Sequence, residues 1–142
     1  MGIVVFDADV VIGYLERTDP HHPDAAKRMR LALETGTRRL ISAVNYTEVL
    51  IRPLQVAGEQ GAATVDAMLT RLGIVIVQVD MALARLAASV RTRTGLRLPD
   101  AYAVATAIHA EKGGREDVRL ESFDEKVVTA YAGLHGSAGE SL

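Results

Sequence analysis

IVVFDADVVI, at residues 3–12, decides the fold, because it joins a β-prone apolar run directly to two acids. The apolar residues before Asp7 predict a strand buried on both faces, as in a parallel sheet covered by helices. Ligand sites in such sheets lie just beyond the carboxyl ends of the strands, where Asp7 falls. An acid among apolar residues is costly unless a cation meets it. The stretch therefore predicts a site for a metal ion or a phosphoryl group, with Asp7 as its first member.

The composition indicates one domain without thiol chemistry. A chain of 142 residues fits a single domain, and 49% hydrophobic residues is too many for a disordered protein. The lack of cysteine excludes disulfide frameworks, Cys-ligated zinc and thiol catalysis. No apolar run approaches the roughly 18 residues of a membrane span, and the first strand leaves no room for a signal peptide, so we expect a cytoplasmic protein without membrane contact. The formal charge of −2 neither demands nor excludes a polyanionic partner.

Strand and helix patterns alternate along the whole chain. Beyond the first strand, we expect strands at 39–42, 74–77 and 118–120, with the IVIV run at 74–77 buried on both faces like the first. Helical spacing fills the intervals, and Pro53 predicts a kink or an early break in the helix at 43–57. The alternation predicts an α/β fold with three layers, α/β/α, around a parallel sheet of four to five strands. We expect the domain at residues 1–132 and a flexible tail at 133–142.

Four acids occupy related places in this pattern. Asp7 and Asp124 end strands, while Glu48 and Asp100 lie in the first turns of helices. These places meet at one edge of a right-handed parallel sheet, where several carboxylates would repel one another unless a cation were present. Mg²⁺ and Mn²⁺ take oxygen ligands and retain water. The four acids together therefore favour metal-assisted hydrolysis of phosphodiesters.

Three of the four acids also have a purely structural interpretation, whereas Asp7 is harder to explain without a function, because strand ends among apolar residues seldom carry an unused acid. Asp100 can serve only the dipole of its helix, and Asp124 can serve only as a helix cap. Glu48 can pair with Arg52 one helical turn later. The adjacent histidines His21 and His22 are interpreted as loop residues in solvent, because neighbouring side chains diverge.

The sequence blocks around the acids resemble those of the PIN-domain ribonucleases, and in particular the VapC-type toxins of bacterial toxin–antitoxin systems. The blocks are VVFDADVVIGYL at 4–15, SAVNYTEVL at 42–50, LRLPDAYAVATAI at 96–108 and SFD at 122–124. They follow one another in the family's order and span nearly the whole chain.

The resemblance implies a PIN-like fold and an endoribonuclease that uses Mg²⁺ or Mn²⁺ to cleave RNA phosphodiester bonds. It implies four catalytic acids, namely Asp7, Glu48, Asp100 and Asp124, three of which (Asp7, Asp100 and Asp124) hold the metal. Ser122 matches the family's small hydroxyl residue and would orient a water molecule or a carboxylate. The resemblance also implies a cognate antitoxin that holds the enzyme inactive, and a homodimer of the toxin.

Two departures from the family pattern bear on the site. Asp9 stands where Ser, Thr or Asn is common, and it either joins the site or caps the first helix. Aliphatic Val127 and Val128 replace the family's aromatic residue after the fourth acid. For RNA contact we expect a basic edge before the third block, formed by Arg91, Arg93 and Arg97.

Two alternatives to the nuclease remain open from the sequence. The first block also fits a haloacid dehalogenase-like phosphatase, in which Asp7 is the nucleophile and Asp9 the general acid. The later Lys and acidic pair that such enzymes need are poorly matched, because Lys112 lies within or beyond a helix. The other alternative is a PIN-like fold kept as a catalytically inactive binding module.

Overall fold

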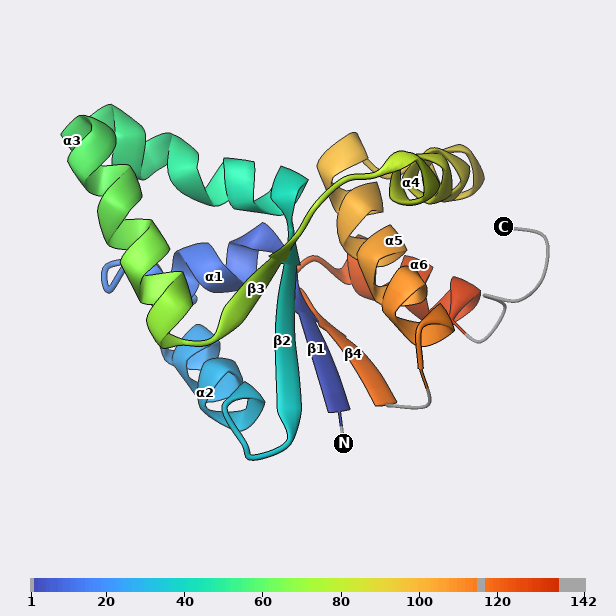
Figure 1. Ribbon diagram of the computed structural model, residues 1–142, viewed down its shortest axis with the longest axis horizontal. Coiled ribbons are helices and arrows are strands. Elements are labelled where there is room, and N and C mark those ends of the chain that lie inside the picture. Colours follow the sequence, from blue (N-terminus) through green and yellow to red (C-terminus); the bar gives the residue numbers. More distant parts are fainter. Residues whose placement is uncertain (1, 115–116, 136–142) are drawn as a thin grey trace.

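A four-stranded parallel sheet between two layers of helices forms the protein (Figure 1). The computed structural model describes residues 2–114 and 117–135, and the strand order is β3-β2-β1-β4. The predicted α/β class, with three layers and a parallel sheet, is confirmed. The elements are β1 (Gly2–Phe6), α1 (Ala8–Leu15), α2 (His22–Ala32), β2 (Thr37–Ser42), α3 (Ala43–Arg71), β3 (Ile74–Val77), α4 (Met81–Thr94), α5 (Leu98–Lys112), β4 (Asp117–Glu121) and α6 (Glu125–Leu134).

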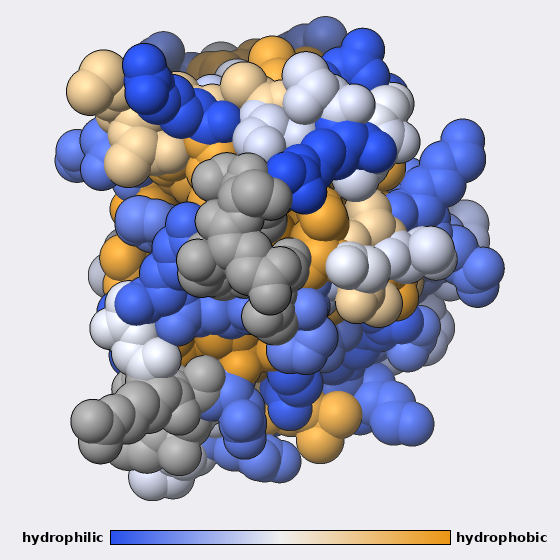
Figure 2. All heavy atoms as spheres, turned by 90° about the vertical axis from the view of Figure 1, so that its right-hand side faces the viewer, coloured by the Kyte–Doolittle hydropathy of each residue, from blue (hydrophilic) through white to orange (hydrophobic). Residues whose placement is uncertain are grey.

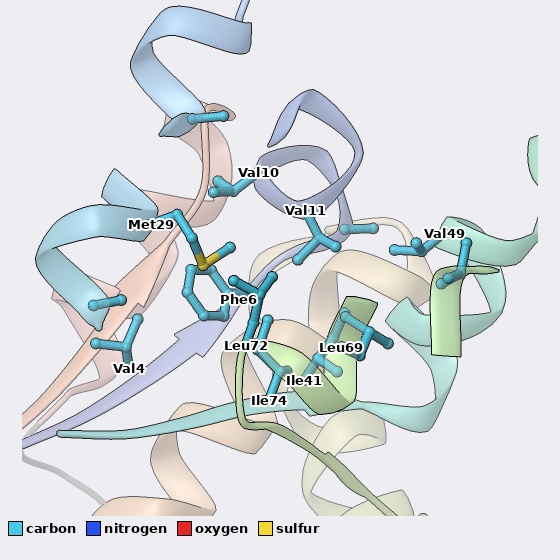
Figure 3. Close-up of a cluster of buried hydrophobic side chains, with 14 residues drawn as sticks. Val4, Phe6, Val10, Val11, Met29, Ile41, Val49, Leu69, Leu72 and Ile74 are labelled. Carbon is cyan, nitrogen blue, oxygen red and sulfur yellow. The ribbon is translucent and has the colours of Figure 1, made fainter. Parts of the chain in front are cut away.

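The two faces of β1 bury alternate side chains in separate cores. Val4 and Phe6 pack with α1, α2 and α3, and Figure 3 shows the Met29 side chain beside the Phe6 ring. Ile3 and Val5 point to the opposite face, which α5 covers. Burial on both faces explains why the run before Asp7 is continuously apolar.

β3 is an edge strand, so the prediction that it is buried on both faces was wrong. It pairs only with β2 in the described sheet, and 59% of Val75 and 36% of Ile76 are exposed. An apolar run gives the type of element but not its place in the sheet.

The break in the long helix α3 lies at Gly58, and not at Pro53 as the sequence predicted. The helix continues through Pro53, whereas Gly58 adopts φ 59° and ψ −143°, a backbone conformation that glycine tolerates and other residues avoid. Gly61 lies close to the other arm, since a Cβ there would stand 2.1 Å from the Pro53 carbonyl oxygen. The two arms form the helical pair at the left of Figure 1.

The strand register brings distant parts of the chain to one edge. Phe6 lies level with Ile41 of β2 and with Glu121 of β4. The next residues therefore leave the sheet together, and the Asp7 amide donates to the Glu121 carbonyl over 2.9 Å. In the described part of the chain, no helix is long and apolar enough to cross a membrane.

Candidate active site

Asp7 lies at the carboxyl end of β1, almost fully buried, with both carboxylate oxygens engaged. The residue is 4% exposed. Oδ1 accepts from the Ala8 amide over 2.8 Å, which caps α1, and Oδ2 accepts from the Ser122 hydroxyl over 2.9 Å. Ser122 Oγ in turn accepts from the Asp124 amide over 3.0 Å. Ser122 thus connects the first acid to the segment that carries the fourth.

Asp9 faces the same segment. Its Oδ2 accepts from the Phe123 amide over 3.0 Å and lies 3.4 Å from Ser122 Oγ. Its Oδ1 is buried, and no described residue hydrogen-bonds to it. Asp9 was expected either to cap the first helix or to join the acids. Asp7 is the cap of α1, and Asp9 lies beside the other acids.

Burial, together with repulsion between neighbouring acids, raises the pKa values of Asp7 and Asp9. Burial raises the pKa of Asp7 to about 7, and repulsion from Asp9 and Asp100 contributes. Burial also raises the pKa of Asp9, with a further contribution from Asp124. A cation placed among these carboxylates would reverse both effects, because it favours the ionised forms.

Asp100 lies in the first turn of α5, where it binds a guanidinium group. Arg97 Nε donates to Asp100 Oδ2 over 3.2 Å, and Arg97 Nη2 donates to Oδ1 over 3.3 Å. The same Nη2 lies 4.0 Å from Glu48 Oε2. Asp100 is buried, whereas the Arg97 side chain is 72% exposed. An exposed cation therefore offsets the negative charge of Asp100 and Glu48 on this side of the site.

Glu48 lies in the second turn of α3, one turn later than expected, and is held by Asn45. The Asn45 side-chain amide donates to Glu48 Oε1 over 3.2 Å and to the Pro99 carbonyl over 3.1 Å. Ser42 Oγ donates to Asn45 Oδ1 over 2.6 Å. Sequence reasoning missed Asn45, although a polar residue one turn before Glu48 on an apolar helix face was a usable signal. Through these bonds to Glu48 and Pro99, Asn45 links the second acidic block to the third.

Asp124 caps α6, as its structural interpretation predicted, by accepting from the Lys126 amide over 2.9 Å. It also lines a cavity of about 740 Å³ together with Asp100 and Arg97.

The structural alternative for Glu48, an ion pair with Arg52 one helical turn later, was wrong, because Arg52 pairs with Glu16 over 3.0 Å.

The other candidate residues are more scattered. Of the three arginines expected at the RNA, Arg97 contacts the acids, while Arg91 and Arg93 lie in the last turn of α4. His22 Nδ1 lies 2.9 Å from the Gly13 carbonyl oxygen. His21 stacks on Phe123, so it is not simply a loop residue in solvent.

The donor set suits a hard divalent ion, although the acids are not yet arranged around one. Within residues 2–114 and 117–135, no three acids or histidines are placed to hold a metal ion. The available donors are nonetheless carboxylate oxygens, one of them the buried Asp9 Oδ1 without a partner. Arg97 donates one hydrogen bond to each oxygen of Asp100, so its guanidinium occupies the position beside this carboxylate that a cation would take.

Comparison with known proteins agrees with the fold. The family model of the PIN domain matches residues 4–133. No curated protein matches the sequence. The VapC20 toxin of Mycobacterium tuberculosis, described as cleaving the sarcin–ricin loop, is 18% identical with a TM-score of 0.67, over 89% of this chain and 94% of that one. A toxin–antitoxin complex from Klebsiella pneumoniae contains a chain 19% identical with a TM-score of 0.64, over 98% and 96%. VapBC2 of Rickettsia felis, bound to a promoter DNA fragment, contains a chain 14% identical with a TM-score of 0.56, over 84% and 99%.

Proposed function

Because the chain belongs to the PIN domain family, we propose that it is a metal-dependent endoribonuclease toxin held inactive by a cognate antitoxin. The observation that carries the proposal is the buried acid cluster, in which Asp7 has a pKa of about 7 through burial and the charges of Asp9 and Asp100. Several carboxylates buried together destabilise a protein unless a bound cation offsets their negative charge.

In this proposal Asp7, Asp100 and Asp124 hold Mg²⁺ or Mn²⁺, and Glu48 completes the catalytic acids. The ion, when bound, supplies a water of lowered pKa and neutralises charge on the phosphoryl group. Ser122 orients the Asp7 carboxylate through its 2.9 Å hydrogen bond. Asn45 holds Glu48 toward the start of α5 through its bonds to Glu48 and Pro99.

RNA is the proposed substrate, and the basic residues between α4 and α5 are its proposed contacts. Arg97, whose side chain is 72% exposed, would contact a phosphate of the RNA beside the acids. Arg91 and Arg93, in the last turn of α4, extend this basic edge. Figure 2 shows the side of the molecule that carries α4 and α6, where hydrophilic side chains predominate between smaller apolar patches.

The proposed partners are an antitoxin and a second copy of the chain, in the cytoplasm. Two of the similar structures come from toxin–antitoxin systems, one of them bound to promoter DNA, which supports an antitoxin as the partner. The phosphatase alternative loses its basis, because the PIN match covers residues 4–133 and not the first block alone.

Expression in a bacterial host tests the function. We expect growth arrest with fragmented cellular RNA from the wild-type chain, and normal growth from Asp100→Asn produced at the same level. Equal growth of both cultures with intact RNA would instead support the inactive binding module.

A further inference from the structure

A second cavity adjoins the acid cluster. It has a volume of about 780 Å³ and is lined by residues that include His21, Arg28 and Phe123. Such a volume falls within the range of small-ligand sites, about 300–1,000 Å³. Ser122 also lines it, so the residue that hydrogen-bonds to Asp7 forms part of its wall.

This cavity and the one that holds Asp100 and Asp124 lie beside each other along α6. Both are lined by Glu125 and Thr129. A flexible chain that lies across α6 can therefore enter both cavities at once. A nucleic-acid strand has this form, with a base beside each phosphate.

Three planar groups form a stack in the second cavity. The His21 ring lies on the Phe123 ring with centroids 4.7 Å apart and an angle of 16° between the planes. The guanidinium carbon of Arg28 lies 4.6 Å from the Phe123 centroid. Arg28 is fixed by Glu121 Oε1 at 3.0 Å and by the Ser122 carbonyl at 3.1 Å, so the stack is anchored to the end of β4.

His21 is the open end of this stack. The residue is exposed, and its main chain is fixed by a 2.8 Å bond from its amide to Asp19 Oδ1. Among the described residues, its ring nitrogens have no hydrogen-bond partner. The side chain thus offers a positioned aromatic face together with a free donor and acceptor. Unpaired bases of RNA are bound by such groups, through stacking and through hydrogen bonds to their edges.

We propose that the cavity of His21, Arg28 and Phe123 is a nucleobase subsite, which binds an unpaired base next to the phosphate at the acids. The inference rests on the proposed ribonuclease function and adds its specificity element. The base stacks on His21, Phe123 supports the His21 ring from behind, and Arg28 holds Phe123 in place. The substrate at this point is therefore single-stranded.

Binding measurements with a single-stranded RNA oligonucleotide test the subsite. All proteins carry Asp7→Asn to prevent cleavage, and the oligonucleotides carry one abasic nucleotide at successive positions. We expect one position at which loss of the base weakens binding at least about fivefold, as stacking energies predict. His21→Ala should weaken binding of the intact RNA by a similar factor and make it insensitive to that abasic position.

Two further variants separate stacking from a structural role. His21→Tyr restores an aromatic face and should bind within about twofold of the parent. His109→Ala removes an exposed imidazole at the far end of α5, outside both cavities, and should leave binding and the abasic profile unchanged. The melting temperature of His21→Ala should lie only slightly below those of the other variants, because the exposed side chain loses its stacked contact with Phe123.

The subsite is overturned if His21→Ala binds like the His109→Ala control, if it keeps the sensitivity to the abasic position, or if the parent binds no RNA. RNA binding with the expected abasic profile, but without cleavage by the wild-type protein, would overturn the nuclease function and leave the subsite standing.

Discussion

Ser122 Oγ donates a 2.9 Å hydrogen bond to Asp7 Oδ2, although the two residues are 115 positions apart in the sequence. The bond forms because β1 and β4 are parallel neighbours in register, so the residues after Phe6 and Glu121 leave the sheet side by side. It joins the first and fourth acidic blocks, which are also linked by the 3.0 Å hydrogen bond from the Phe123 amide to Asp9 Oδ2.

Ser122→Ala should lower the rate of RNA cleavage about tenfold, because the Asp7 carboxylate loses the donor that orients it. The unfolding free energy should fall by about 1–2 kcal/mol, since a buried acceptor loses its partner. Ser122→Thr keeps the hydroxyl and is the control. Initial rates and denaturant melts measure both effects. Cleavage by Ser122→Ala at the wild-type rate would contradict an orienting role.

Asp7 should make the metal-free protein less stable as the pH rises. The folded carboxyl group has a pKa of about 7 against an ordinary value of 3.8. Between these values the folded state binds more protons than the unfolded state, so the unfolding free energy decreases with rising pH and then levels off above pH 7. Asp7→Asn removes this loss and should be the more stable protein at pH 8, by roughly 1–4 kcal/mol.

Thermal melts in a metal chelator at pH 4.5 and pH 8 measure this difference. The advantage of Asp7→Asn should be small at the lower pH and full at the higher one. An advantage that is the same at both values would show that Asp7 titrates normally.

Arg97 should compete with the metal for Asp100. Arg97→Gln removes the bidentate cation, so Mn²⁺ should bind more tightly and raise the melting temperature at lower concentrations than in the wild type. RNA binding should weaken several-fold, because a phosphate contact is lost. Arg30→Gln, at an exposed site in the last turn of α2, is the control of equal charge. If both variants shift Mn²⁺ binding equally, the pairing of Arg97 with Asp100 has no part in it.

Asn45→Ala should lower both stability and activity. The substitution removes the acceptor of the buried Ser42 hydroxyl and the donor to the partly buried Pro99 carbonyl, which costs about 1–3 kcal/mol, although Ser42 Oγ still accepts from the amide of residue 45. Activity should fall further than stability explains, because Glu48 loses the donor to Oε1. Rates measured well below the melting temperature separate the two. Wild-type activity in the folded variant would show that Glu48 needs no such support.

The sequence was sufficient where a local pattern determines the structure. The apolar run before Asp7 predicted both a strand buried on both faces and the edge of the sheet at which the candidate acids lie. The same kind of run at 74–77 predicted a strand but not its exposed position, because neighbours in a sheet are set by the whole topology. The helix break at Gly58 was assigned to Pro53, since a proline inside a helix is tolerated when its neighbours can adapt.

The site contacts depend on pairs of residues that no local pattern connects. Asp9 was left between two roles, and its bond to the Phe123 amide shows which neighbours it has. Arg97 was expected at the RNA, but in the structure it binds Asp100. His21 was expected in solvent, and its stacking on Phe123 arises from two segments about 100 residues apart.

Cleavage of an RNA in the presence of Mn²⁺ is the most direct test of the central claim, that the acids around Asp7 form a metal-dependent nuclease site. Purified wild-type protein should fragment the RNA with Mn²⁺ and not with a chelator. Asp7→Asn, folded and equally pure, should be at least about a hundredfold slower, as expected for loss of a metal ligand. RNA that stays intact with the wild type, or equal cleavage by both proteins, would contradict the account.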